Sequence, residues 1–133
     1  MNKQGLLSDA EIISVYSREQ AIDDGFLVDV SDSSECQRLG FRFPVALTRA
    51  VWDRFVEVPK GVIGQDMVGR LWEILRVLRM NIRSGANGGE IWFSLRVRND
   101  NREGVPPLIA LKAVCRPGDN GDPCITIMRF SED

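Results

Sequence analysis

The clearest pattern of apolar and polar positions in the chain lies between Asp66 and Arg83. Apolar residues recur there at intervals of three and four, which places them on one face of an α-helix. Other apolar residues widen that face until only a narrow polar strip remains. The apolar set is Met67, Val68, Leu71, Trp72, Ile74, Leu75, Val77, Leu78 and Ile82. We therefore expect a long helix that is buried on most sides and around which the rest of the chain is packed.

The C-terminal part changes to the period of a β-strand. Apolar and polar residues alternate from Ile91 to Arg98, and two further apolar segments follow, Leu108–Cys115 and Cys124–Phe130. The loop between the last two contains Asn-Gly, a pair typical of hairpin turns, and lacks the later ligands of a calcium-binding loop. Short polar loops join the three segments, so the pattern predicts a three-stranded antiparallel meander.

The N-terminal part carries shorter elements. The first 13 residues show little periodicity, and we expect them to be disordered. Ser17 and Gln20 fit a helix capping box, and glycines separate the segments that follow. The expected elements are a helix over Arg18–Asp24, a strand over Phe26–Val30, one or two helical turns within Ser31–Leu39 capped by Ser31 or Asp32, and a helix over Pro44–Val56.

The length of the chain, 133 residues without an internal repeat or a linker, predicts one domain. The expected fold is a single α+β domain over residues 1–133. It has a long core helix and shorter N-terminal helices packed on a three-stranded antiparallel β-meander. One face of that sheet packs on the long helix, and the other is either exposed or covered by the N-terminal segments.

The composition argues against several classes of active site. The chain has no histidine, which removes the commonest general base and metal ligand and argues against Ser-His-Asp, Cys-His and zinc-hydrolase sites. The odd number of cysteines, Cys36, Cys115 and Cys124, without a Cys-x-x-Cys pair predicts idle thiols in a reducing compartment. No apolar run reaches the length of a membrane span, and no secretion signal stands at the N-terminus. We expect a cytoplasmic protein that has no cofactor and does not enter a membrane.

The net charge of −2 is unevenly distributed. Residues 1–40 hold eight acidic and three basic side chains, whereas residues 41–103 hold seven acidic and eleven basic ones. Either the two parts attract each other inside the fold, or they form a dipolar surface that steers a charged partner.

An acidic group near the N-terminus is the first candidate site. Asp23, Asp24 and Asp29, with Asp32 and Glu35 nearby, could hold a divalent cation or divide acid and base roles. The alternative is structural, because aspartates commonly end or cap short helices.

A basic and aromatic set on the expected sheet is the second candidate. Trp92, Arg96 and Arg98 share one side of the alternating strand, and Lys112 and Arg129 lie on the neighbouring strands. Such a face can form the centre of a protein interface or stack and hold a nucleic acid. Alternatively, the acidic N-terminal segment covers it.

The polar strip of the long helix is the third candidate. Arg76, Arg79 and Arg83 align in one row, with Glu73 at the distance of a helical ion pair from Arg76. The row is either a solvated helix face or part of a groove for an anionic partner.

Four phrases occur together in one known family: YSREQAIDDGFLVDVSD, GFRFPVALTRAVWD, GRLWEIL and RPGDNGDPCITIM. The chain resembles, from about Tyr16 to Met128, an uncharacterised domain-of-unknown-function family encoded on bacterial plasmids, integrative elements and phages. The resemblance implies a cytoplasmic accessory protein of a mobile element and carries over no catalytic residue.

By analogy with other small proteins of such elements, we expect a non-enzymatic binding protein that inhibits a host macromolecular complex, such as a CRISPR or restriction system. Its expected partner is a host protein or a ribonucleoprotein. The alternatives are a metal-dependent enzyme or nucleic-acid-processing factor using Asp23, Asp24 and Asp29, and a sequence-independent nucleic-acid-binding protein.

Overall fold

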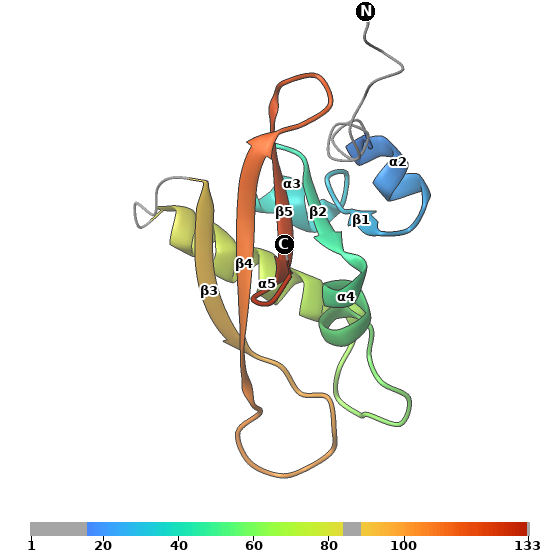
Figure 1. The fold of residues 1–133 in the computed structure, drawn as a ribbon. Helices are drawn as coiled ribbons and strands as arrows, with labels where there is room; N and C mark the ends of the chain where they lie inside the picture. The colour runs from blue at the N-terminus through green and yellow to red at the C-terminus, as the bar shows by residue number, and fades with distance from the viewer. Residues whose placement is uncertain (1–15, 84–88, 133) are drawn as a thin grey trace, which may run out of the picture.

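The fold is a mixed β-sheet with helices on both faces, shown in a computed structural model (Figure 1). The structure describes residues 16–83 and 89–132, and the side chain of Arg83 lies outside that description. The described elements, in chain order, are α2 (Arg18–Asp23), β1 (Leu27–Asp29), α3 (Ser34–Leu39), β2 (Val45–Thr48), α4 (Arg49–Val51), the π-helical turn η2 (Trp52–Val56), α5 (Met67–Arg83), β3 (Glu90–Arg96), β4 (Leu108–Pro117) and β5 (Pro123–Arg129).

The predicted three-stranded antiparallel meander is wrong, although the fold is α+β in broad terms. In the described part of the chain the sheet has five strands in the order β1-β2-β5-β4-β3. The three predicted strands are present and pair as antiparallel neighbours. On the far side of β5, however, β2 adds in parallel, with Val45 opposite Ile125 and Leu47 opposite Ile127, and β1 then pairs antiparallel to β2.

The helix predicted over Pro44–Val56 is also wrong in its first part. Val45, Ala46 and Leu47 are fully buried strand residues between β1 and β5. A strand buried on both faces reads as a short continuous apolar run, which periodicity cannot distinguish from a helix. Helical structure begins only after Thr48, whose side chain accepts a hydrogen bond from the backbone N–H of Val51.

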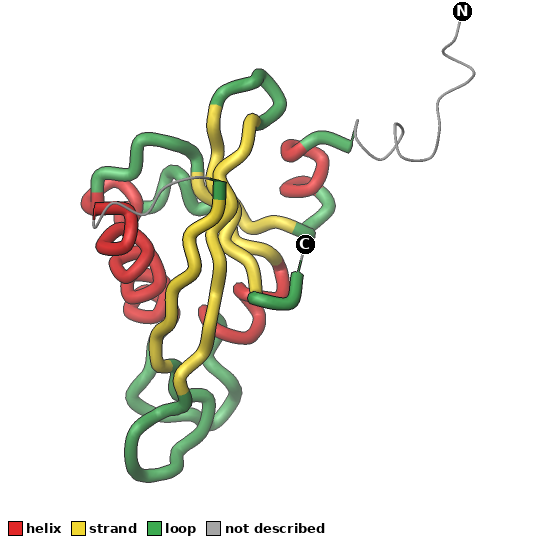
Figure 2. Tube along the Cα trace, turned by 60° about the vertical axis from the view of Figure 1, so that its left-hand side comes forward, coloured by secondary structure: helices red, strands yellow, loops and turns green. Residues whose placement is uncertain are grey.

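The long helix occupies the expected residues but is not enclosed on most sides. Leu71, Ile74, Leu75 and Leu78 are buried, whereas Val68 is 64% exposed. In Figure 2, α5 lies along one face of the sheet, so the residues that face the sheet are buried while part of its other side stays exposed; α3 and η2 also pack against it. The helix is therefore half of a two-layer core rather than the centre of the molecule.

The short N-terminal elements are capped by their own side chains. The capping box at Ser17 is confirmed, since its side chain and that of Gln20 exchange hydrogen bonds with the backbone. Ser33, rather than Ser31 or Asp32, caps α3, and Gly40 ends that helix with a φ of 75°. The predicted disorder of residues 1–13 concerns residues outside the described ones.

Hydrogen bonds hold helix α2 on the second face of the sheet, by which we mean the face opposite α5. Arg18 donates hydrogen bonds to the side-chain oxygen of Thr126 and the backbone oxygen of Ile125, both at 2.7 Å. In return, Asp119 in the β4–β5 turn accepts from the backbone N–H groups of Arg18 and Glu19 at 2.8 and 3.1 Å. These contacts hold α2 over the side of the sheet that lies away from β3 (Figure 1).

Replacing Leu75 by Ala should lower the free energy of unfolding by about 2–5 kcal/mol, because the side chain is fully buried and leaves a cavity. Urea titration measures the loss. Val68→Ala in the same helix is the matched control and should cost less than about 0.5 kcal/mol, since its side chain is mostly exposed. Equal losses for the two variants would mean that the buried face of α5 is assigned to the wrong residues.

Candidate functional site

An exposed aromatic pair stands on the second face of the sheet, near its β3 edge. Trp92 in the middle of β3 is 54% exposed, and Phe130, just after β5, is 52% exposed. Their rings meet edge to face with centroids 4.5 Å apart. The indole N–H of Trp92 donates to the Glu90 carboxylate at 3.0 Å, which fixes the ring on the surface. We name these two residues, with Arg96 and Leu108, the Trp92 surface.

The remaining members of the Trp92 surface, Arg96 and Leu108, lie further along the sheet, at the C-terminal end of β3. Arg96 is exposed and lies opposite Leu108 in the register of β3 and β4. Its guanidinium donates to the backbone oxygen of Pro106 at 2.8 Å. Leu108 is itself 59% exposed. Lys112, directly opposite Trp92, is buried and therefore lies beneath this surface rather than on it.

Arg98 does not continue the alternation, because β3 ends at Arg96. Its guanidinium turns into the following loop and donates to the backbone oxygens of Arg102 and Gly104. The Asp100 carboxylate lies 4.0 Å from it. Arg98 thus shapes the β3–β4 loop next to the Trp92 surface.

Arg70 of α5 links this end of the sheet to the segment after η2, a role that was not predicted from the sequence. It is buried and donates to the backbone oxygens of Glu57 and Arg98 and to the side chain of Asn99, each at 2.5 Å. Burial lowers the pKa of its guanidinium from the ordinary value. Arg70 was not singled out from the sequence, because its acceptors lie 13 to 29 positions away and only the tertiary structure brings them together.

The outer edge of β3 is open in the described part of the chain. Two hydrogen bonds to β4 fix the orientation of the strand: Val97 N–H to the Pro107 oxygen at 3.1 Å, and Cys115 N–H to the Gly89 oxygen at 2.8 Å. The alternate residues therefore point their backbone groups away from β4. These residues are Glu90, Trp92, Ser94 and Arg96. Among the described residues no strand pairs with that edge.

The arginine row of α5 does not act as one strip and lies on the opposite face of the sheet from Trp92. Arg76 forms an ion pair with Glu73 at 2.8 Å, and this hydrogen-bonded partner lowers the pKa of Glu73. Arg79 donates its Nε–H to the backbone oxygen of Leu39 at 3.0 Å. The side chain of Arg83 is outside the described part of the structure.

The acidic residues of the N-terminal part have local roles. The Asp24 carboxylate accepts the hydroxyl of Tyr16 at 2.7 Å, which raises the pKa of Tyr16 to about 12. Asp29 accepts from the backbone N–H and hydroxyl of Ser31. Asp23 completes no ligand set with them, because no three His, Cys, Asp or Glu side chains in residues 16–83 and 89–132 are placed to hold a metal ion.

Charge pairing between the acidic and basic parts of the chain is not seen in the described residues. The ion pairs there join side chains at most four positions apart, as for Arg49 with Asp53. The acidic helix α2 does not cover Trp92 either, which is more than half exposed. The second possibility, a dipolar surface that steers a partner, stays a prediction.

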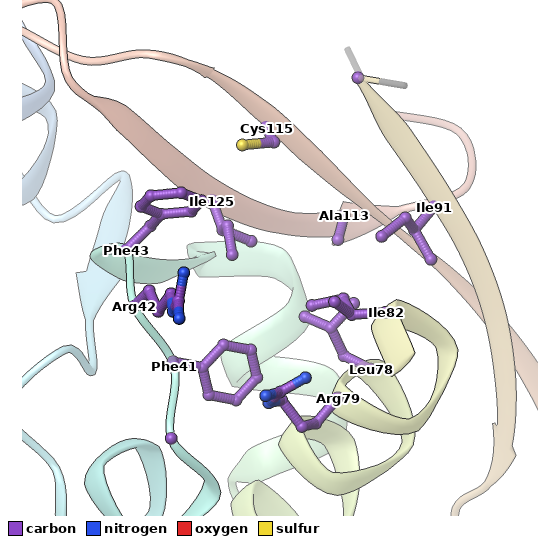
Figure 3. Close-up of a pocket in the computed structure, with 12 residues that line it drawn as sticks. Phe41, Arg42, Phe43, Leu78, Arg79, Ile82, Ile91, Ala113, Cys115 and Ile125 are labelled. Atoms are coloured by element: carbon purple, nitrogen blue, oxygen red, sulfur yellow. The ribbon is translucent and has the colours of Figure 1, made fainter. Parts of the chain in front are cut away.

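A pocket of about 210 Å³ opens on the α5 face of the sheet, and the sequence did not predict it (Figure 3). Its walls come from the end of α3 and the segment before β2, from the C-terminal half of α5, and from β3, β4 and β5. Most of the lining is apolar, with Arg42 and Arg79 as its charged members. We call it the α5 pocket; its lining residues include Phe41, Arg42, Phe43, Leu78, Arg79, Ile82, Ile91, Ala113, Cys115 and Ile125.

The three cysteines are free thiols. Cys36 and Cys124 are buried, and burial is the main cause of the raised pKa of the Cys36 thiol. Only Cys115 borders the α5 pocket.

The comparisons with known proteins show the family. A family model described as "Family of unknown function (DUF6573)" matches residues 1–133. The chain belongs to the DUF6573 family. No curated protein matches this DUF6573 chain, and no solved structure does. Within its described residues, no helix combines the length and apolar character needed to cross a membrane.

The Glu73–Arg76 pair predicts a pH effect. Since the folded protein holds the pKa of Glu73 below its ordinary value, the pair stabilises the fold above the ordinary pKa. This contribution is lost as the pH falls through the lowered one. Its size should be only about 0.2–0.5 kcal/mol, because both side chains are 40–44% exposed. Carbon NMR of the Glu73 carboxyl should show its pKa rising in Arg76→Gln and unchanged in Arg102→Gln. A Glu73 pKa unaffected by Arg76→Gln would contradict the assigned cause.

Proposed function

We propose that this DUF6573 protein is a non-enzymatic accessory binding protein of a mobile genetic element. It acts in the cytoplasm by docking on a host protein complex through the Trp92 surface. A defence complex, such as a CRISPR or restriction system, is the most concrete candidate for inhibition. The mobile-element context rests on the sequence resemblance alone, whereas the surface is argued from the structure.

The exposed Trp92–Phe130 pair is the observation that carries the proposal. Two aromatic rings in edge-to-face contact, each more than half exposed, present apolar area that water solvates poorly. Trp and Arg are enriched at the energetic centres of protein interfaces. Arg96 and Leu108 extend the same surface, so a partner would find an aromatic anchor with a cation beside it.

The open edge of β3 indicates how the partner would dock. Alternate residues from Glu90 to Arg96 direct backbone N–H and C=O groups outward. An extended segment of the partner could pair with them as an added strand. Arg96 lies at the end of that edge, whereas the Glu90 carboxylate already accepts the Trp92 indole N–H. The best-fitting occupant is therefore an extended partner segment with an acidic side chain opposite Arg96.

Trp92→Ala combined with Arg96→Glu should reduce retention of the host partner at least about tenfold. The melting temperature should stay within a few degrees, because both side chains are exposed. The measurement is affinity capture from a nuclease-treated host lysate, with quantitative mass spectrometry and a thermal melt of each variant.

Val68→Ala combined with Arg42→Glu is the matched control, since it makes the same kinds of change at exposed residues away from the Trp92 surface. Specific retention by the parent and the control, with loss in the test variant, supports the proposal. Equal retention by all three proteins contradicts it. Retention that is seen only in a parallel lysate without nuclease treatment, and that falls steeply with salt, would instead favour direct nucleic-acid binding.

A further inference from the structure

The α5 pocket lies on the opposite side of the sheet from the Trp92 surface, so it is a separate feature. Ile91, Ala113 and Ile125 line it from three neighbouring strands. Each is next in sequence to a residue of the other face, as Ile91 is to Trp92. Because side chains alternate along a strand, a ligand in the pocket does not touch the Trp92 surface.

The wall of the pocket is aliphatic and aromatic. Leu78 and Ile82 come from α5, Phe41 and Phe43 from the segment before β2. A dry apolar cavity of about 150 Å³ is large enough to take up benzene. The α5 pocket, at about 210 Å³, therefore has room for one aromatic ring or a short branched alkyl group, but not for a long acyl chain.

Two arginine side chains, Arg42 and Arg79, line this apolar pocket. Figure 3 shows Arg42 from the segment before β2 and Arg79 from α5 reaching into the region between those segments. Arg42 makes no hydrogen bond or ion pair with another described residue. Within residues 16–83 and 89–132, Arg79 donates only its Nε–H, to the backbone oxygen of Leu39. No carboxylate of the described residues forms an ion pair with either.

Guanidinium groups without a carboxylate partner, next to a low-dielectric cavity, attract an anion more strongly than they would in water. Their planar N–H donors match the two oxygens of a carboxylate. A purely apolar ligand would leave both guanidinium groups without a counter-ion. A small inorganic anion would leave the apolar wall of the cavity without contact. The features are satisfied together only by a molecule that carries both groups.

We propose that the α5 pocket binds a small amphiphilic carboxylate. Its single ring or short branched chain fills the cavity between Ile82, Ile91 and Ala113, and its carboxylate accepts hydrogen bonds from Arg42 and Arg79. The site is a ligand-binding site independent of the partner surface proposed above.

3-Phenylpropionate is a suitable probe, because it joins one ring to one carboxylate by a short linker. Its affinity should be modest, with a Kd of about 0.1–1 mM, as expected for a ligand of this size. Titration followed by amide NMR should shift the signals of pocket residues such as Gly89, Ile91 and Ala113. The Trp92 indole N–H signal, on the other face, should stay unchanged and serves as an internal control.

Two comparisons separate the contributions of charge and shape. 3-Phenylpropionamide has the same shape without the charge and should bind at least about tenfold more weakly. Arg42→Gln should weaken 3-phenylpropionate to a similar degree without unfolding, since Arg42 is exposed and has no partner in the described residues to lose. Arg102→Gln, at an 88% exposed arginine outside the pocket, is the matched control and should leave the Kd unchanged.

The absence of saturable shifts up to about 10 mM would overturn the proposal. So would equal affinity for the acid and the amide, or an Arg42→Gln variant that binds as tightly as the parent. Shifts confined to residues outside the pocket would place the carboxylate elsewhere and equally reject this site. None of these outcomes bears on capture of a protein partner by the Trp92 surface, so the two proposals fail independently.

Discussion

The parallel pairing of β2 with β5 is the contact on which the rest of the structure depends. It joins Val45, Ala46 and Leu47 to Ile125, Thr126 and Ile127, segments far apart in the sequence. Among the described strands β1 pairs only with β2, so this contact also attaches β1 and the α3 connection to the sheet. The same register brings the Gly40–Phe43 segment next to Ile125 and so forms one wall of the α5 pocket.

Alternation along the strands then gives the sheet two different faces. Ile91, Phe93 and Leu95 point toward α5 and complete the core, while Trp92 and Arg96 point away from it. Helix α2 covers the second face only near Thr126, where Arg18 binds it. The part of that face next to β3 is left with its aromatic pair exposed, which is the reason why we propose it as the partner surface.

Arginine has two distinct uses in this protein. Arg18 donates to a backbone oxygen of strand β5, whereas Arg70 and Arg98 donate to backbone oxygens beside β3 and in the loops; all three thus act as internal links. A planar donor with five N–H groups suits this role because it can satisfy several carbonyls at once. Arg42, Arg79 and Arg96 make fewer hydrogen bonds to other described residues. They lie at the two sites that we propose to bind other molecules, the α5 pocket and the Trp92 surface.

The sequence by itself determined the features that arise from neighbouring residues. The capping box at Ser17, the residues of α5 and the three C-terminal strands follow from side-chain chemistry and periodicity within a few positions, and all are present. The outward orientation of Trp92 follows from the same alternation. Tertiary structure decided that Val45–Thr48 is a strand, that Lys112 is buried and that Arg98 turns into its loop. It also formed the α5 pocket, whose walls come from separate segments. These outcomes depend on which distant segments pack together, and the local pattern of a segment does not specify its partners across the fold.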